Sequence, residues 1–284
     1  MNNTYRIKSF KKPKDLANLV ECVKSFGAYH RSYCWYTSLD RVLQTIKYRR
    51  LWLTRLDPGV FDDGIEHKKY GLDKERKRTY IRSFMYGIQE SVAMWGLYCQ
   101  PTYKAIRMNI TQKAMKLLLG RKVYKTSDNG NTSDECKVKE SAITDLLYAA
   151  VENKEEERPR VNKLHWNGFY SKPIANLKNE KGRRYATGIV KDAEWRFENE
   201  CRLVCKVVKD CEEHVAVDLP IEFFNEISFV LSPWANAYER EFVCKQIRGY
   251  FSNIGKEVDA NDGRMFQRSK LESGLQKWAR ERGL

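Results

Sequence analysis

Apolar residues recur along the chain with two different spacings, and the switching between them predicts a mixed α+β fold. Alternating or continuous apolar residues predict strands, whereas apolar residues three and four positions apart predict helices. Strands are predicted over residues 33–40, 50–57, 80–86, 103–110, 201–208, 214–219 and 226–231, and helices over 41–47, 90–98, 113–119, 238–252 and 269–284. We therefore expect a central sheet, mixed but mainly antiparallel, with flanking helices.

Polar stretches set the expected boundaries. A length of 284 residues is enough for one large domain or two small ones. Residues 1–30 combine a short strand-like start with a helix that Gly27 ends, and we interpret them as a lead-in to a single α+β domain over residues 31–284. Residues 126–136 predict a polar loop, whereas the apolar residues 141–151 fit a strand or a helix.

Charge and composition narrow the class of partner. The net charge of +15 favours a polyanion, nucleic acid in particular, although a basic surface that only aids solubility is the alternative. Basic residues gather at 68–82, with interleaved tyrosines, and at 178–184. No apolar run approaches the ~20 residues that span a bilayer. With no apolar signal segment at the N-terminus and no C-x-x-C pair, we expect a cytoplasmic protein with reduced cysteines and no membrane partner.

The candidate site is the stretch Trp195–Val208, whose second half predicts a buried strand. Alternate side chains of a strand share a face, so Glu198, Glu200 and Arg202 are expected on one face, with the two carboxylates about 7 Å apart. Paired carboxylates suit a reaction that develops positive charge. The spacing fits equally an exposed polar face on which Arg202 pairs with the acids.

Other chemical motifs are sparse. Neither a glycine-rich dinucleotide loop nor a P-loop is present, and the four histidines lie far apart in the sequence. Asp62, Asp63 and Glu66 follow a predicted strand, and clustered carboxylates can hold a divalent cation, although such a loop is more often a solvated turn.

Four stretches together resemble a bacterial family of uncharacterised function that is often found among phage-defence genes. They span roughly residues 33–271. The two most specific elements are Met-Trp-x-x-Tyr and Trp-x-x-Glu-x-Glu-x-Arg. The stretches are Trp35–Ser38 with Leu51–Asp57 and Phe61–Asp63, Ser91–Tyr98, Trp195–Arg202, and Ile227–Pro233.

More distantly, the chain is similar to ADP-ribosyltransferases, including toxins that modify DNA or RNA. This resemblance implies an ADP-ribosyltransferase-like fold, NAD as the cofactor, and a cytoplasmic phage-defence toxin of a toxin-antitoxin pair that modifies RNA rather than DNA. Glu200 matches the catalytic glutamate and Glu198 the acid two positions before it. The implied NAD contacts are Tyr36 and Thr37 at the ribose, Trp95 and Tyr98 at the nicotinamide, and Arg55 and Arg202 at the pyrophosphate.

Two other functions stay open at this point. In a nucleic-acid-binding module without catalysis, Glu198 and Glu200 are structural partners of Arg202 or nearby lysines. In a metal-dependent nuclease, the Asp62 to Glu66 loop acts together with the glutamate pair. Release of nicotinamide, salt-dependent binding without turnover, and cleavage that EDTA abolishes distinguish the three.

Overall fold

A computed structural model describes most of the region from Ser32 to Gly274. The described residues are 32–56, 73–87, 89–99, 104–126, 132–145, 147–151, 164–166, 173–175, 187–188, 190–209, 211, 213–259 and 263–274. The predicted lead-in over residues 1–30, the acidic loop around Asp62, the basic loop 178–184 and most of the predicted tail helix lie outside them.

The predicted strands and helices up to residue 119 and over residues 201–252 occur in the predicted order, and the structure adds a short helix and several short strands that the pattern did not predict. The first ten elements are β1 (Ser32–Ser38), α2 (Leu39–Tyr48), β2 (Arg50–Arg55), α4 (Asp73–Arg76), β3 (Thr79–Tyr86), α5 (Val92–Tyr98), β4 (Ala105–Thr111), α6 (Gln112–Lys116), β5 (Val123–Thr126) and β6 (Thr132–Cys136). The others are β7 (Val138–Asp145), β8 (Leu147–Val151), β9 (Leu164–Trp166), β10 (Pro173–Ala175), β11 (Val190–Asp192), η2 (Ala193–Glu198), β12 (Glu200–Val207), β13 (His214–Asp218), η3 (Ile221–Asn225), β14 (Ile227–Leu231), α8 (Ala237–Asn253) and β15 (Phe266–Gln267).

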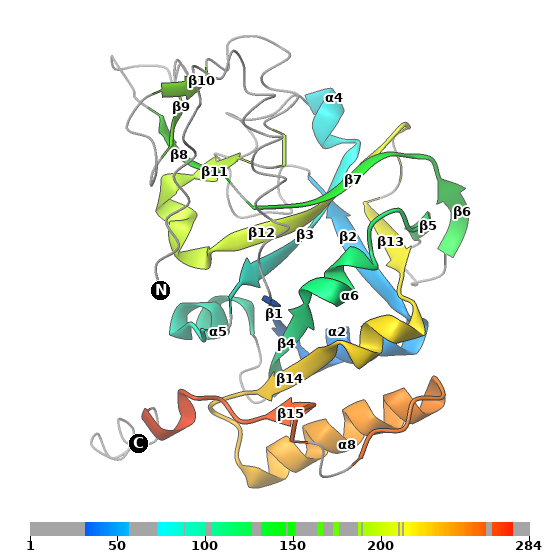
Figure 1. The fold of residues 1–284 in the computed structure, drawn as a ribbon, viewed down its shortest axis with the longest axis vertical. Helices are drawn as coiled ribbons and strands as arrows, with labels where there is room; N and C mark the ends of the chain where they lie inside the picture. Colours follow the sequence, from blue (N-terminus) through cyan, green and yellow to red (C-terminus); the bar gives the residue numbers. More distant parts are fainter. Residues whose placement is uncertain are drawn as a thin grey trace.

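The expected mixed, mainly antiparallel sheet is confirmed. Among the described residues it has 11 strands, in the order β15-β14-β4-β1-β3-β2-β13-β5-β6, with β12 pairing both β3 and β7. A second sheet, of four strands, has the order β10-β9-β8-β11 and lies at the upper left of Figure 1. Within the described ladders only β14–β15 and β8–β11 are parallel.

Strand β3 is the centre of the large sheet, and one of its edges is shared by two strands. Among the described strands, one edge of β3 pairs with β12 alone, from Thr79 to Met85. On the shared edge β2 pairs with Tyr80 and Ile81, and β1 pairs with Met85 and Tyr86. Strands β1 and β2, which α2 connects in sequence, therefore pair with different parts of the same edge of β3 and are not paired with it over the residues between.

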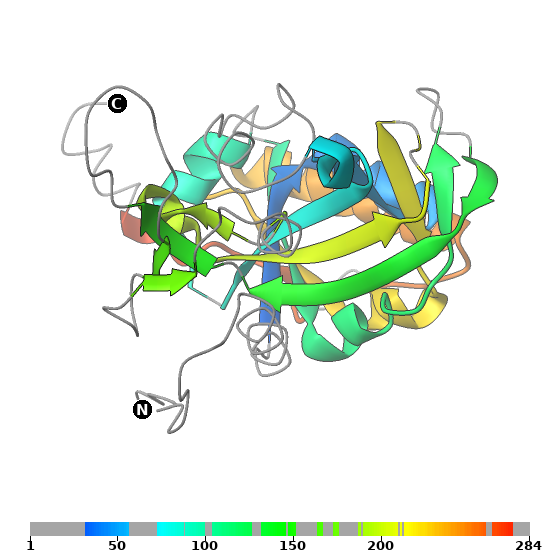
Figure 2. The ribbon, with the colours of Figure 1, turned by 90° about the horizontal axis from the view of Figure 1, so that it is seen from above.

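The two faces of the sheet pack against different hydrophobic clusters. The main core contains Trp35, Phe84 and Leu203 together with buried residues of α2, α6 and α8. A smaller cluster on the other face contains Tyr36, Met85 and residues of α5. Figure 2 shows α5 and α6 on opposite sides of the curved strands β7 and β12. The alternation of side chains along each strand thus separates a structural core from the face that carries the candidate site.

Helix ends are set by local signals in the sequence. Asn236 and Glu239 form a reciprocal capping box at the start of α8. The side chains of Ser91 and Thr111 accept hydrogen bonds from the backbone at the starts of α5 and α6.

Two local predictions need correction. The predicted polar loop 126–136 contains strand β6, which pairs with β5 and leaves only residues 127–131 outside the described part. Glu198 was expected on the same strand as Glu200, but it ends the 3₁₀ helix η2, and β12 begins at Glu200. The ambiguous stretch 141–151 forms strands β7 and β8.

Candidate functional site

The early strand β1 and helix α5 are joined by contacts between residues that belong to separate sequence motifs. The backbone N–H of Ser91 donates to the hydroxyl of Tyr36 at 3.1 Å. The rings of Tyr36 and Trp95 meet edge to face with centroids 5.0 Å apart. Trp95 is fully buried, and its indole N–H donates to Glu90 at 3.2 Å. Trp95 therefore packs behind the candidate site and is not placed to stack on a ligand.

Beside α5, the two glutamates form a buried ionic cluster around one lysine. The ammonium group of Lys191 donates to Glu198 at 2.5 Å and to Glu200 at 3.1 Å. Arg202 donates to both oxygens of Glu200, at 2.6 Å from Nε and 3.3 Å from Nη2. The hydroxyl of Tyr98 donates to the other oxygen of Glu198. Glu198 and Glu200 are only 3% and 4% exposed.

A single residue in an unusual backbone conformation brings the two carboxylates together. Asn199, between η2 and β12, has a φ of 42°, in the left-handed region that asparagine adopts more readily than most residues. Its backbone carbonyl accepts a hydrogen bond from Tyr86 at 3.0 Å, which ties the junction to β3. The acids therefore meet through a turn and a shared lysine, although they do not lie on one strand.

The pKa values of the two carboxyl groups are displaced in opposite directions. Burial raises the pKa of Glu198, and the negative charge of Glu200 adds to this effect, while Lys191 opposes it. Burial also acts to raise the pKa of Glu200, but the charges of Arg202 and Lys191 outweigh it and hold this pKa at about 2. Glu200 is thus a fixed carboxylate, whereas Glu198 is the carboxyl that gains a proton more readily.

Exposed aromatic side chains border the cluster on its solvent side. Tyr98 and Phe197 are each 45% exposed. Trp195 lies between Lys191 and Phe197, with its ring 4.7 Å from the Lys191 ammonium and 6.0 Å from the Phe197 ring. Exposed rings beside a charged cluster offer flat surfaces on which a planar heterocycle can stack.

Two of the sequence-predicted NAD contacts lie apart from this cluster. Arg55 is opposite Tyr80 on β3, whereas Glu200 is opposite Met85, five residues further on, or roughly 16 Å along the strand. Arg55 instead donates to the carbonyl of Cys211 at 3.0 Å. Thr37 faces the main core with Trp35, since alternate residues of β1 share a face.

Arg202, the other expected pyrophosphate contact, lies in the cluster and bonds to protein groups there. Besides its two bonds to Glu200, its Nη1 donates to the carbonyl of Gly188 at 3.2 Å. Gly188 has a φ of 82°, which favours glycine. Arg202 pairs with Glu200, as the alternative interpretation of the motif predicts, but the exposed polar face in that interpretation is wrong, because Glu198, Glu200 and Arg202 are buried and β12 pairs with a strand on each edge.

The sequence analysis missed several residues that complete the cluster. Lys191 lies nine positions before Glu200 on a short strand that was not predicted. Ser83, on β3, donates a side-chain hydrogen bond to Glu200 and was not singled out. Glu90 accepts hydrogen bonds from Ser269 at 2.5 Å and from the backbone of Lys270 at 2.7 Å, which anchors the C-terminal segment beside α5. A basic residue close before a carboxylate pair is the one sequence signal available.

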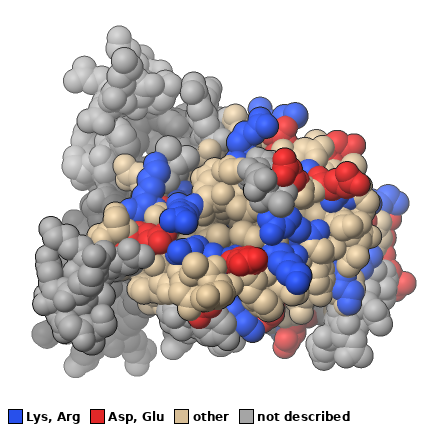
Figure 3. Space-filling model, turned by 90° about the horizontal axis from the view of Figure 1, so that it is seen from below, with Lys and Arg blue, Asp and Glu red and all other residues tan. Residues whose placement is uncertain are grey.

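The described surface is basic, and metal-binding geometry is not found on it. On the face seen in Figure 3, Lys and Arg side chains lie along the middle with acidic groups scattered between them. Among the described residues, no three His, Cys, Asp or Glu side chains come together as metal ligands. No described helix combines the length and the apolar character needed to cross a bilayer. The Asp62, Asp63 and Glu66 loop lies outside the described part.

Of the sequence-predicted NAD contacts, Tyr98 and Arg202 bond directly to the glutamate pair. Tyr36 and Trp95 contact each other beside α5, and Thr37 and Arg55 lie elsewhere. Comparison of the chain with protein-family models, with curated protein sequences and with solved structures finds no match.

Proposed function

We propose that this protein transfers ADP-ribose from NAD to a nucleic acid, with RNA the preferred acceptor over DNA. The observation that carries the proposal is the carboxylate pair on Lys191, in which the pKa of Glu198 is raised and that of Glu200 is lowered. Two carboxyl groups whose pKa values are driven apart by their surroundings are typical of acid–base catalysis. The low pKa also keeps Glu200 charged beside a developing cation.

Glu198 is the better candidate for the carboxylate that contacts substrate. One of its oxygens is held by Lys191, and the other accepts a hydrogen bond from the hydroxyl of Tyr98, whose ring is partly exposed. A ribose hydroxyl can replace the Tyr98 hydroxyl at that oxygen with the same donor geometry. Glu200 has its oxygens engaged by Arg202 and Lys191, which favours an electrostatic role over direct contact and so reverses the roles implied by the resemblance.

In the proposed reaction, the carboxylates stabilise charge on the ribose, and Glu198 also accepts a proton from the acceptor. The bond between the ribose C1′ and the nicotinamide nitrogen breaks, and neutral nicotinamide leaves with the electron pair. Positive charge develops on the ribose, and two nearby carboxylates stabilise it; such electrostatic effects are worth about 3 to 4 kcal/mol for each group. The acceptor's nitrogen or oxygen bonds to C1′, and Glu198, with its raised pKa, takes the proton that the acceptor loses.

The described residues fit the nicotinamide-ribose end of NAD better than its pyrophosphate. Tyr98 and Phe197 supply exposed rings for the planar nicotinamide, next to Glu198. Neither Arg202 nor Arg55 offers a free fork for the phosphates in this arrangement. The net charge of +15 supports a polyanionic acceptor. A toxin of this kind acting on cytoplasmic RNA would need an antitoxin partner, which fits the phage-defence setting of the resembling family.

The test is to incubate the protein with NAD and an RNA or DNA oligonucleotide. We expect release of nicotinamide, together with a rise in oligonucleotide mass by one ADP-ribosyl group. Glu198→Gln should reduce the rate at least 100-fold, while Lys122→Gln, a substitution in an exposed ion pair far along the chain, should leave it unchanged. No release of nicotinamide with either acceptor would reject the proposal.

A second candidate is a nucleic-acid-binding module without catalysis. The burial and mutual pairing of Glu200, Arg202 and Lys191 favour it, because such a cluster also serves to hold η2 and β11 against β12. This candidate predicts oligonucleotide binding that weakens steeply with salt and no turnover of NAD.

A further inference from the structure

On the opposite face of the sheet from the glutamates, Arg82 is a cation with no anionic partner among the described residues. Its guanidinium stacks on the ring of Trp35 at 3.9 Å. Its Nε is buried without a hydrogen-bond partner. Within the described residues it forms no ion pair with Asp or Glu. An arginine that is partly buried without a carboxylate is unfavourable unless a ligand supplies the missing charge.

Arg82 lies where the sheet divides. It is the next residue of β3 after the two that pair with β2, and Met85, which pairs with β1, comes three residues later. Met85 is opposite Glu200, so Arg82 points to the other face, as its neighbour Leu203 does. The site is therefore separate from the Glu198–Glu200 cluster and independent of the proposed transferase activity.

A second cation lies near Arg82. Arg41, in the first turn of α2, is exposed and forms no ion pair among the described residues. Burial lowers the pKa of Arg82 to about 9, and the positive charge of Arg41 contributes. Asp40, the acid in the same turn, pairs with neither arginine. The two positively charged guanidinium groups repel each other, and one bound anion would attract both.

Unsatisfied hydrogen-bonding groups occur on the same side of β1. The hydroxyl of Thr37, a residue only 2% exposed, is buried without a hydrogen-bond partner. Thr37 shares a face with Trp35, on which Arg82 stacks. The next residue, Ser38, precedes α2 and its side chain makes no capping bond, so the first N–H groups of this 10-residue helix are not capped by it.

We propose that Arg82, Arg41 and Thr37 form a binding site for the phosphate group of a ligand, at the division between β1 and β2. The planar fork of arginine binds two phosphate oxygens at once, and the Trp35 ring behind Arg82 holds the fork in position. Arg41 adds charge from the solvent side, and the Thr37 hydroxyl and the start of α2 add donors. The ligand class is a phosphate monoester or free phosphate.

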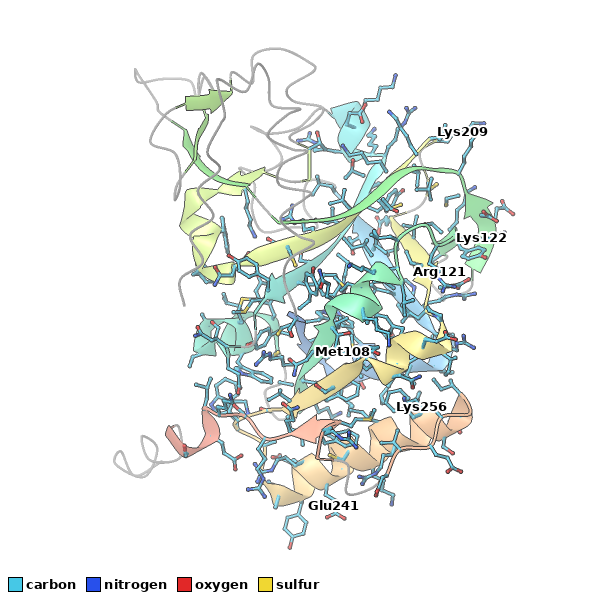
Figure 4. All side chains as sticks on the ribbon, in the orientation of Figure 1. Met108, Arg121, Lys122, Lys209, Glu241 and Lys256 are labelled. Atoms are coloured by element: carbon cyan, nitrogen blue, oxygen red, sulfur yellow. The ribbon has the colours of Figure 1, made fainter. Side chains whose placement is uncertain are left out.

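The experiment measures binding of inorganic phosphate and of AMP by calorimetry at constant ionic strength in chloride. Arg82→Gln should weaken binding of the tighter ligand at least tenfold, and Arg82→Lys, which retains the charge and loses the fork, should also weaken it tenfold. Arg121→Gln is the matched control, because this exposed arginine, labelled in Figure 4, lies between α6 and β5 and donates to the carbonyl of Leu117, and its replacement should change binding less than twofold.

Folding is checked by thermal unfolding of each variant. If Arg82→Gln does not fold, Arg41→Gln tests the phosphate site instead. Arg41 is exposed, so this variant should fold, and it should bind the phosphate probes several-fold more weakly than the wild type. Preference for AMP over inorganic phosphate would identify a nucleotide ligand, and the reverse preference a free phosphate. Equal affinities for the wild type, Arg41→Gln and Arg121→Gln, or no saturable binding of either probe, would overturn the proposal.

Discussion

Replacing Arg202 with methionine removes the main partner of a buried carboxylate and should destabilise the fold severely. Arg202 donates to both oxygens of Glu200 and to the carbonyl of Gly188, and it is almost completely buried. Methionine has a similar length and donates no hydrogen bond, so Glu200 would lose both of its bonds to Arg202 while keeping those to Lys191 and Ser83. Breaking a buried ion pair from one side costs about 3 to 5 kcal/mol.

The lowered pKa of Glu200 has the direction that this pairing requires, because the positive charges of Arg202 and Lys191 both favour the ionised carboxylate and outweigh its burial. For a protein of this size, a loss of about 3 to 5 kcal/mol lowers the melting temperature by on the order of 10 °C.

The assay is urea unfolding followed by tryptophan fluorescence, with two comparisons. Lys122→Met breaks an exposed ion pair to Glu135, of 2.8 Å, and should lose about 1 kcal/mol or less. The double variant Arg202→Met with Glu200→Leu removes both buried charges and should lose less than Arg202→Met alone. Equal losses for Arg202→Met and Lys122→Met, or a double variant worse than the single one, would refute this account of the cluster.

Three further predictions follow from the same contacts. The free energy of unfolding should fall as the pH drops from 4.5 to about 2. The lowered pKa of Glu200 makes its stabilising contribution complete above pH 4.5, and that contribution is lost progressively as the pH falls to about 2. Acid unfolding measures this fall, and Glu200→Gln should flatten that part of the curve. Gly188→Ala should destabilise the protein by about 1 kcal/mol more than Gly87→Ala, as measured by urea unfolding. Both glycines have a positive φ, but only at Gly188 would a new Cβ lie 3.1 Å from a side-chain carbon of Thr79. Tyr98→Phe should leave stability within about 1 kcal/mol of the wild type. It should also shift the pH profile of kcat/KM for nicotinamide release to higher pH, because in the free protein the Tyr98 hydrogen bond lowers the pKa of Glu198.

Much of the fold was predictable because its strands and helices carry their own local signals. The order β1, α2, β2 follows directly from the change of apolar period, and α8 was placed within a residue at each end. Strand β6 was missed because its sequence, Thr-Ser-Asp-Glu-Cys, lacks alternating apolar residues and depends on pairing with β5.

The candidate site was predicted in part, and its failures have a common physical cause. The sharing of one face by Glu200 and Arg202 follows from the period of two in a strand and is confirmed by their ion pair. The break at Asn199 and the position of Lys191 depend on a backbone angle and on a contact between separate strands, which residue spacing does not encode. That Arg82 has no carboxylate partner among the described residues has no signature in the sequence for the same reason.

The central claim is that Glu198, released from Tyr98, acts on the ribose of NAD. The most direct measurement is the initial rate of nicotinamide release, with an RNA acceptor present, for the wild type and for Glu198→Gln at matched folded fractions. The account predicts turnover by the wild type and a rate at least 100-fold lower for the variant. Equal rates for the two proteins, or no nicotinamide from the wild type, would contradict it.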